Sequence, residues 1–421
     1  MAPNGSPARP QLIRAMNEQL LLEHIRLADG VSRADLARIS GLAKNTVSLA
    51  LANLERANLV RVSGVRTGMP GPAAVLYEVR PEAGFVLALD VGRQYVRGAV
   101  ADVAGVIRAR TSVKTQASSG HARVADLVAL ADSLLHDAGI TRADITQTVL
   151  GSPGVHDPQR GRIALAGALP GWEKPGVLAE LREAFGAALM IENDVDAAAL
   201  AEQAHGHGNG VDSFAFVWVG TGVGMGLVLG GRLHRGRHGA AGEIGYMPLD
   251  TGVSDASVEK DARRRGSLEA SASAAGVVRA ARRAGARRPI SARQVFAAAE
   301  RGDAWATTVV ADEARLVARA VCAVVTVVDP ELVVLGGGIC QAAGFVDAVA
   351  GHLRTLTPVM PDLKVSALGA DAVVDGCLAA GIDRAWQSIT AAIPPPTTPV
   401  PAQPTSDGGG IALAVSAPAE R

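Results

Sequence analysis

The stretch "SFAFVWVGTGVGMGLVLGGRL", residues 213–233, is the strongest guide to the fold. Its two apolar runs around a glycine turn predict a pair of adjacent strands, and glycines inside a strand indicate close backbone approach. Other β-rich segments with glycine turns lie at residues 85–92, 95–107, 146–155, 188–194 and 331–339. Helical stretches separate several of them, so the sequence predicts two α/β lobes with a cleft between them.

Length and composition agree with a layered α/β protein. The chain has 421 residues, which suggests two or three domains at roughly 150 residues each. Hydrophobic residues make up 48% and aromatic residues only 3%, so the core must consist mainly of Ala, Val and Leu. The formal net charge is zero, but residues 1–80 hold ten Lys or Arg against six Asp or Glu. A basic surplus therefore lies at one end of the chain.

Cysteines and apolar runs bear on the compartment. Cys322, Cys340 and Cys377 have no C-x-x-C spacing, which argues against both a disulfide framework and a zinc cluster. No apolar run approaches the length of a membrane span, and the N-terminus lacks a signal-peptide pattern. We therefore expect a soluble, cytoplasmic protein with reduced thiols and no membrane partner.

The first 80 residues follow a different pattern. After one helical segment, residues 31–60 predict a short helix, a glycine turn and a longer helix. Ser32 and Asp35 form a capping-box signature for the short helix. Residues 60–79 then alternate like two strands around a Gly/Pro-rich tip. This order predicts a winged helix-turn-helix domain over residues 12–80.

The longer helix, which begins near Lys44, could enter the major groove of DNA. Its apolar residues Val47, Leu51 and Leu54 can pack inward, which leaves polar side chains outward. The residues expected to contact DNA are Lys44, Asn45, Thr46 and Ser48 on this helix and Arg61 and Arg66 in the wing. The alternative for any one of them is an ordinary solvated side chain. The wing tip, "TGMPGPA", lacks the arginine that often lies among such glycines.

The rest of the chain divides into a core and two ends. We expect residues 84–391 to form the two-lobed domain. Residues 1–11 and 392–421 are expected to be disordered, because the tail is rich in Pro, Gly, Ser and Thr with few core-forming residues.

Three segments in this order carry a family resemblance. They are "IENDVDAAALAEQ" (residues 191–203), "GTGVGMGLVLGGRLHRG" (220–236) and "AAGEIGYMPLD" (240–250). Together with "SPGVHD", "ALPGW" and "DPELVVLGGGI", they resemble the ROK family of sugar kinases and sugar-responsive repressors. The resemblance implies an actin-like, sugar-kinase-like fold. A winged helix-turn-helix ahead of it resembles the repressor branch, such as the N-acetylglucosamine and xylose repressors.

The resemblance also implies site residues. Asp194 holds the place of the kinase aspartate that takes a proton from a sugar hydroxyl, and Asn193 would orient the sugar. Glu243 and Glu269 match carboxylates that hold ring hydroxyls, and Tyr246, directly after "GEIG", is expected to contact the same effector. The alternative for each acid is a surface charge or a helix cap.

Two departures from the family pattern concern metal and nucleotide. Zinc-containing members carry a histidine at the place of Tyr246 and cysteines before the second glutamate, whereas residues 250–273 contain none. We therefore expect no metal and no cofactor. At the place of the kinases' first phosphate loop, "LDVGRQYVRGAV" (residues 89–100), Arg93 and Gln94 replace the small residues and Tyr95 stands near the hydroxyl position, which hinders approach of a triphosphate. Should nucleotide bind, the residues expected to contact it are Gly220, Thr221, Gly222 and Gly224.

These observations favour a transcriptional regulator, a repressor, that binds operator DNA and responds to a sugar or sugar phosphate. The resemblance implies a homodimer or higher homo-oligomer, and no catalytic residue is expected. One alternative is an active ATP-dependent sugar kinase with an added DNA-binding domain, in which Asp194 would be catalytic. Another is a regulator that senses a protein partner.

Overall fold

The computed structural model describes residues 10–28, 30–67, 73–157, 161–167, 169–249, 256–286 and 290–392, without the side chains of residues 10, 11, 256 and 257. Most of the two ends predicted to be disordered, residues 1–9 and 393–421, lies outside the described residues, and so do residues 68–72 of the predicted wing tip. Residues 10 and 11 belong to the first helix.

The N-terminal unit, residues 10–79, combines three helices with a small sheet. Its elements are α1 (Pro10–Arg26), β1 (Val31–Ser32), α2 (Arg33–Ser40), α3 (Lys44–Arg56), β2 (Val60–Arg66) and β3 (Ala74–Val79). Ser32 and Asp35 form the predicted capping box at the start of α2, and Gly41 ends that helix in the left-handed conformation at φ 70°. The strands pair antiparallel in the order β1-β3-β2. Buried apolar residues of all three helices, including Leu36 and Leu51, form the core with Tyr77.

The first lobe is built on a five-stranded mixed sheet. Its strands are β4 (Phe85–Val91), β5 (Tyr95–Asp102), β6 (Ile107–Lys114), β7 (Ile145–Ser152) and β10 (Leu189–Asn193), in the order β10-β7-β4-β5-β6. Helices α4 (Gly120–Ala138) and α5 (Val177–Phe185) pack on one face through a buried cluster that includes Leu89 and Leu134. The short strands β8 (Val155–Asp157) and β9 (Arg162–Ala164) form a separate pair near the cleft.

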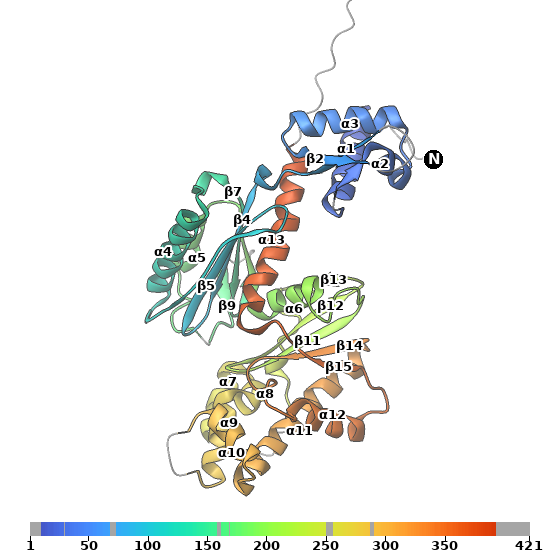
Figure 1. Ribbon diagram of the computed structural model, residues 1–421. Coiled ribbons are helices and arrows are strands. Elements are labelled where there is room, and N and C mark those ends of the chain that lie inside the picture. The colour runs from blue at the N-terminus through green and yellow to red at the C-terminus, as the bar shows by residue number, and fades with distance from the viewer. Residues whose placement is uncertain are drawn as a thin grey trace, which may run out of the picture.

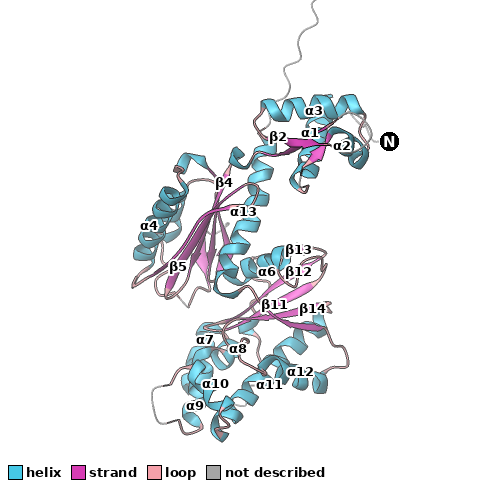
Figure 2. Cartoon of the chain, in the orientation of Figure 1, coloured by secondary structure: helices cyan, strands magenta, loops and turns pink. Residues whose placement is uncertain are grey.

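The second lobe repeats this plan with a second five-stranded sheet. Its strands are β11 (Phe214–Val219), β12 (Val223–Leu229), β13 (Arg232–Leu233), β14 (Leu332–Gly336) and β15 (Asp362–Val365), in the order β13-β12-β11-β14-β15. A layer of helices covers its far face, as Figure 2 shows. These are α7 (Ala256–Arg265), α8 (Ser267–Ala272), α9 (Ala274–Arg283), α10 (Ala292–Glu300), α11 (Ala304–Val328) and α12 (Phe345–Leu356). The predicted pair of α/β lobes is confirmed.

Two helices connect the lobes. Helix α6 (Asp194–His205) follows β10 of the first lobe and packs on β11 and β12 of the second. Helix α13 (Ala372–Ala391) starts after β15, crosses α6 and runs along the first sheet to the N-terminal unit (Figure 1). Gly376 makes the crossing close, because a Cβ added there would lie 1.7 Å from the Ala197 carbonyl oxygen. The backbones of α6 and α13 are therefore in direct contact at this crossing.

The far end of α13 joins the first lobe to the N-terminal unit. Arg26 of α1 forms an ion pair with Asp383 at 2.7 Å. Trp386, which is buried, donates a hydrogen bond to the Val103 carbonyl oxygen at 2.9 Å. Leu22 of the N-terminal unit and Trp386 belong to one continuous buried cluster.

Among the described residues, no helix combines the length and apolarity that crossing a membrane requires.

Candidate functional site

A cavity of about 290 Å³ lies where the two lobes meet, and both lobes line it. This volume is near the lower end for small-ligand pockets, which start at roughly 300 Å³. Its lining includes these polar residues and glycines: Gly92, Arg93, Gly154, Asn193, Asp194, Thr221, Gly222, Gly224, Glu243, Tyr246, Arg264, Arg265 and Glu269. The structure thus brings together every residue expected to bind the effector, although they are up to 76 positions apart in sequence.

Asn193 and Asp194 lie at the start of α6, where the sequence predicted a helix mouth. The Asn193 side chain caps the helix, accepting hydrogen bonds from the amides of Val195 at 2.8 Å and Asp196 at 3.1 Å. Its amide nitrogen donates to the Gly154 carbonyl oxygen at 3.1 Å. Asn193 therefore fixes the geometry of the site, and its acceptor oxygen is already occupied.

The carboxyl group of Asp194 holds its proton more tightly than an ordinary aspartate does. Burial raises the pKa of its carboxyl group to about 6, against the lowering effect of hydrogen bonds from the amides of Val195 and Asp194 itself. Only one carboxylate oxygen receives the Val195 amide, at 2.9 Å. The carboxylate is thus able to accept a hydrogen bond or a proton from a ligand hydroxyl.

Glu243 and Glu269 line the same cavity as Asp194. Burial, with the charges of Asp194 and Glu269, raises the pKa of Glu243 to about 7. Burial also raises the pKa of Glu269, whose carboxylate accepts from the Val223 amide at 3.0 Å and pairs with Arg265 at 3.2 Å. Three carboxyl groups so close together cannot all ionise freely. They offer fixed acceptors to a ligand that carries several hydroxyl groups.

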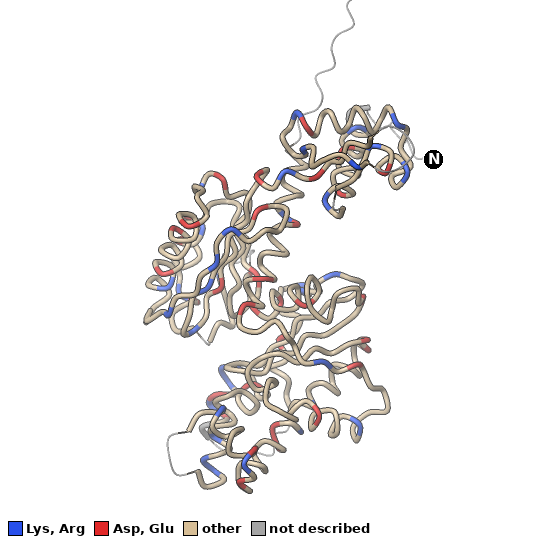
Figure 3. The backbone as a smooth tube through the Cα atoms, viewed as in Figure 1, with Lys and Arg blue, Asp and Glu red and all other residues tan. Residues whose placement is uncertain are grey.

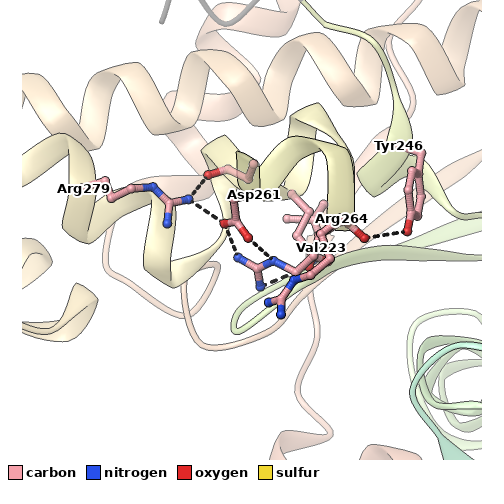
Figure 4. Close-up of polar contacts among 8 residues, drawn as sticks. Val223, Tyr246, Asp261, Arg264 and Arg279 are labelled. Atoms are coloured by element: carbon pink, nitrogen blue, oxygen red, sulfur yellow. Dashed lines mark hydrogen bonds and ion pairs between the residues drawn. The ribbon is translucent and has the colours of Figure 1, made fainter. Parts of the chain in front are cut away.

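Tyr246 occupies the rim of this cavity rather than its floor. Its hydroxyl donates to the Arg264 carbonyl oxygen at 3.1 Å, as Figure 4 shows. The hydrogen bond attaches the segment after Glu243 to α7.

Among the described residues, no group of His, Cys, Asp and Glu is arranged to hold a metal ion.

Arg93, in the hairpin between β4 and β5, also lines the cavity. The Gly92 amide donates to the Tyr95 carbonyl oxygen at 2.9 Å, so it serves the turn itself. The Gly92 carbonyl oxygen in turn accepts from buried Arg123 at 3.1 Å. Arg97 donates to Asp90 at 3.0 Å. Sequence reasoning missed Arg97 and Arg123, because strand alternation does not show which arginine reaches which partner.

The hairpin between β11 and β12 has glycines that its packing requires. A Cβ on Gly222 would lie 2.9 Å from a Glu269 carboxylate oxygen, and one on Gly224 would lie 3.0 Å from Val195. At Gly226 it would lie 2.5 Å from the Cβ of Ala199. Contact with α6 and with Glu269 therefore accounts for these glycines without a nucleotide.

The residues expected to contact DNA do not form one uniform surface. Lys44, Asn45 and Ser48 are exposed on α3, and Thr46 is half-buried. Arg66 forms an ion pair with Asp35 of α2 at 3.1 Å. Arg61 pairs with Glu78 at 2.7 Å, at the base of the wing near the first lobe. Both wing arginines thus have carboxylate partners, which sequence reasoning did not foresee. In Figure 3, basic and acidic positions alternate around this unit.

Comparison with known proteins shows a family and two kinds of relative. A sequence model of the ROK family matches residues 86–379. The bifunctional enzyme NanE/NanK of Brucella suis biovar 1 is 37% identical over 232 residues, which are 52% of this chain and 42% of that protein. The putative xylose repressor of Caldicellulosiruptor sp. (strain Rt8B.4) is 25% identical over 240 residues, 57% of this chain and 60% of that protein. The chain therefore spans less than two thirds of either relative.

Solved structures extend the comparison. The ROK hexokinase from Thermus thermophilus, 31% identical, superposes with a TM-score of 0.61 over 71% of this chain and 98% of its own. A ROK family transcriptional regulator, described as a homologue of the E. coli MLC protein, is 24% identical. It superposes with a TM-score of 0.73 over 90% of this chain and 98% of its own. The shared fold thus covers more of this chain in the regulator than in the hexokinase.

Proposed function

The chain belongs to the ROK family, and we propose that it is a sugar-responsive transcriptional regulator, a repressor. In this proposal the N-terminal unit is a winged helix-turn-helix domain that binds operator DNA. The cleft binds a sugar or sugar derivative, which changes the affinity for DNA. A homodimer or higher homo-oligomer would present two α3 helices to the two half-sites of an operator.

The N-terminal unit supports this role by its arrangement. Helices α2 and α3 are joined by the left-handed turn at Gly41, and β2 and β3 extend beside them. Lys44, Asn45 and Ser48 project from the first turns of α3 while Val47 and Leu51 are buried. Exposed donors and acceptors at the start of a packed helix suit the major groove.

The observation that carries the proposal is the continuous connection between the cleft and the N-terminal unit. Asp194 begins α6, α6 crosses α13 at Gly376, and α13 pairs with α1 through Asp383. Closure of the cleft around a ligand would shift α6 and, through the crossing, α13. Because binding at two linked sites is reciprocal, operator DNA must change the effector's affinity by the same factor.

Binding of operator DNA by wild-type protein and by two variants tests the DNA surface. Asn45→Ala should weaken binding by on the order of 1 to 3 kcal/mol at fixed salt, since a base contact carries about that much discrimination. Arg66→Ala should weaken binding to all DNA sequences alike and make the affinity depend less steeply on salt concentration. Lys364→Ala is the matched control, because Lys364 is a half-exposed cation on β15 of the second lobe. Unchanged affinity in both N-terminal variants would rule out this DNA surface.

Effector response tests the cleft independently. Glu243→Gln should abolish the effect of ligand on DNA binding and leave the affinity of the ligand-free protein for DNA unchanged, because Glu243 belongs to the cavity alone. Asp383→Ala should weaken the response by breaking the ion pair to Arg26 without touching the cavity. A full response in both variants would show that the effector binds elsewhere.

An active sugar kinase is the second candidate, and two observations favour it. The relatives include the NanE/NanK enzyme and a glucokinase of Halalkalibacterium halodurans, 28% identical over 69% of this chain. Asp194 also retains a half-buried position beside the glycine hairpin. Against it stands the first hairpin, whose Gly92 amide is used within the turn and whose tip presents Arg93. Both candidates use the same cavity for the sugar.

A further inference from the structure

A second cavity, of about 520 Å³, adjoins the cleft. It shares Arg93, Thr221, Arg264 and Arg265 with the 290 Å³ cavity that holds the carboxylates. Its other described lining residues are Lys260, Asp261, Ala274, Ala275 and Arg279. Because the two cavities have these residues in common, a single ligand can extend from the carboxylates into the second cavity.

The charges of the second cavity are opposite to those of the first. Asp261 is the one acid among its described lining residues, and it is held between Arg265 at 2.7 Å and Arg279 at 3.1 Å (Figure 4). Arg265 also pairs with Glu269 at 3.2 Å, so two carboxylates, Asp261 and Glu269, offset the charges of these two guanidinium groups. The remaining three cationic side chains, those of Arg93, Lys260 and Arg264, form no hydrogen bond or ion pair with any residue that the structure describes. Their charge is therefore available to an anion.

Neutral donors add to this positive charge. The Thr221 hydroxyl belongs to the glycine hairpin and lines both cavities. Ala274 and Ala275, in the first turn of the ten-residue helix α9, line the second cavity, and the N-cap Ser273 makes no side-chain cap. The Ala274 amide is used by the Gly220 carbonyl oxygen at 2.7 Å. The positive end of the α9 dipole thus reinforces the cationic side chains.

We propose that the effector is a phosphorylated sugar whose phosphoryl group binds in the second cavity, between Arg93 of the first lobe and Lys260 and Arg264 of the second. The inference rests on the proposed function and specifies its ligand. Hydroxyl groups of the sugar donate to the carboxylates of Asp194 and Glu243, which would repel a phosphate. The phosphate lies among cations whose side chains form no hydrogen bond or ion pair with the described residues.

This arrangement gives the phosphate a mechanical role. Arg93 comes from the β4–β5 hairpin, whereas Lys260 and Arg264 lie on α7. A phosphate held by both sides bridges the lobes and favours the closed cleft, whereas a free sugar leaves the cations of both lobes facing each other. The presence of the phosphate, and not only the sugar, would thus set the position of α6 and α13.

Melting temperatures in inorganic phosphate, measured for the wild type and three variants, test the phosphate site. Sodium phosphate should raise the melting temperature of the wild-type protein relative to sodium chloride at equal ionic strength, because a ligand of the native state stabilises it. Arg93→Ala and Lys260→Ala should lose this rise. Arg263→Ala should keep it, since Arg263 is exposed on the same helix and does not line the cavity. An equal rise in all four proteins would overturn the proposal.

Calorimetry with paired ligands then separates the sources of the phosphate. Glucose 6-phosphate or N-acetylmannosamine 6-phosphate should bind about tenfold or more tightly than its free sugar, and Arg93→Ala should remove most of that gain. Free sugars that bind as tightly as their phosphates would overturn the proposal, and so would a phosphate-dependent rise that only ATP produces. If a sugar phosphate binds as expected but never alters DNA affinity, the site stands and the proposed function fails.

Discussion

The two hairpins that face the cleft differ in what their turns do. In the β4–β5 hairpin, Gly92 uses its amide within the turn and Arg93 projects a cation into the cavity. In the β11–β12 hairpin, Gly222 and Gly224 keep the space that Glu269 and Val195 fill. The glycine-rich hairpin is thus required by packing, and the bulky one carries a binding group. Retained glycines are therefore poor evidence for nucleotide binding in this chain, whereas Arg93 is evidence for an anion.

The largest expected effect tests the packing role of the second hairpin. Gly226→Ala should lower the free energy of unfolding by about 2 to 3 kcal/mol, because its Cβ would lie 2.5 Å from Ala199 and 2.9 Å from the Val195 carbonyl oxygen. Gly224→Ala should cost about 1 kcal/mol or less, since it meets the Val195 side chain at 3.0 Å. Urea unfolding curves measure both. Equal stability of Gly226→Ala and the wild type would contradict the packing argument.

The carboxylates make the next effect depend on pH. The pKa of Glu243 is raised to about 7 in the folded protein, so the unfolded chain ionises first as pH rises. The contribution of Glu243 to stability should therefore fall between about pH 4.5 and pH 7 and stay level above. Glu243→Gln should be more stable than the wild type by on the order of 1 to 2 kcal/mol at pH 8, and similar to it at pH 4. A difference that does not change with pH would show that Glu243 is not buried among acids.

A smaller effect tests the first hairpin. Tyr95→Thr removes the ring over which Arg97 lies, 5.2 Å from the centroid, and should cost about 0.5 to 1 kcal/mol. The substitution places a hydroxyl near the turn. It leaves Arg93 in place, as well as the hydrogen bond from the Gly92 amide to the carbonyl oxygen of residue 95. Magnesium-ATP should therefore raise the melting temperature of the variant no more than it raises that of the wild type. A larger rise in the variant would show that Tyr95 alone had blocked a phosphate loop.

No effect at all is expected from a chelator. Among the residues that the structure describes, no group of His, Cys, Asp and Glu is arranged to hold a metal ion, and α7 is held by the ion pairs of Asp261 with Arg265 and Arg279. EDTA should leave the melting temperature unchanged, and elemental analysis should find no stoichiometric zinc. One zinc per chain would show that a metal site involves residues outside the described ranges.

Local sequence signals predicted the parts of the structure that depend on local chemistry. The Ser32 and Asp35 capping box, the left-handed turn at Gly41 and the start of α6 at Asp194 all lie where the pattern placed them. Each depends on residues within a few positions of one another, so spacing alone reveals it. The two-lobed fold followed from the alternation of strands and helices and from the family resemblance.

Long-range partners could not be predicted in this way. The pairing of Arg97 with Asp90 and the crossing of α6 and α13 at Gly376 exist only after the sheets and helices have packed. The basic run ending α7, Arg263 to Arg265, was visible in sequence but could not be assigned to a cavity. Only the fold shows that Arg264 faces the cleft while Arg263 does not. The cationic cavity was therefore the main feature that sequence reasoning missed.

We infer that the cleft senses a ligand and transfers no phosphate. A coupled kinase assay with magnesium-ATP and a panel of sugars, run on protein whose DNA binding responds to effector, tests it most directly. Phosphoryl transfer requires the triphosphate and its metal to be held in line with the sugar hydroxyl. The β4–β5 hairpin presents Arg93 there, and the Gly92 amide already donates a hydrogen bond within the turn. We expect no turnover above the rate without protein. Turnover of about 1 to 100 per second, the usual range for kinases, would contradict it.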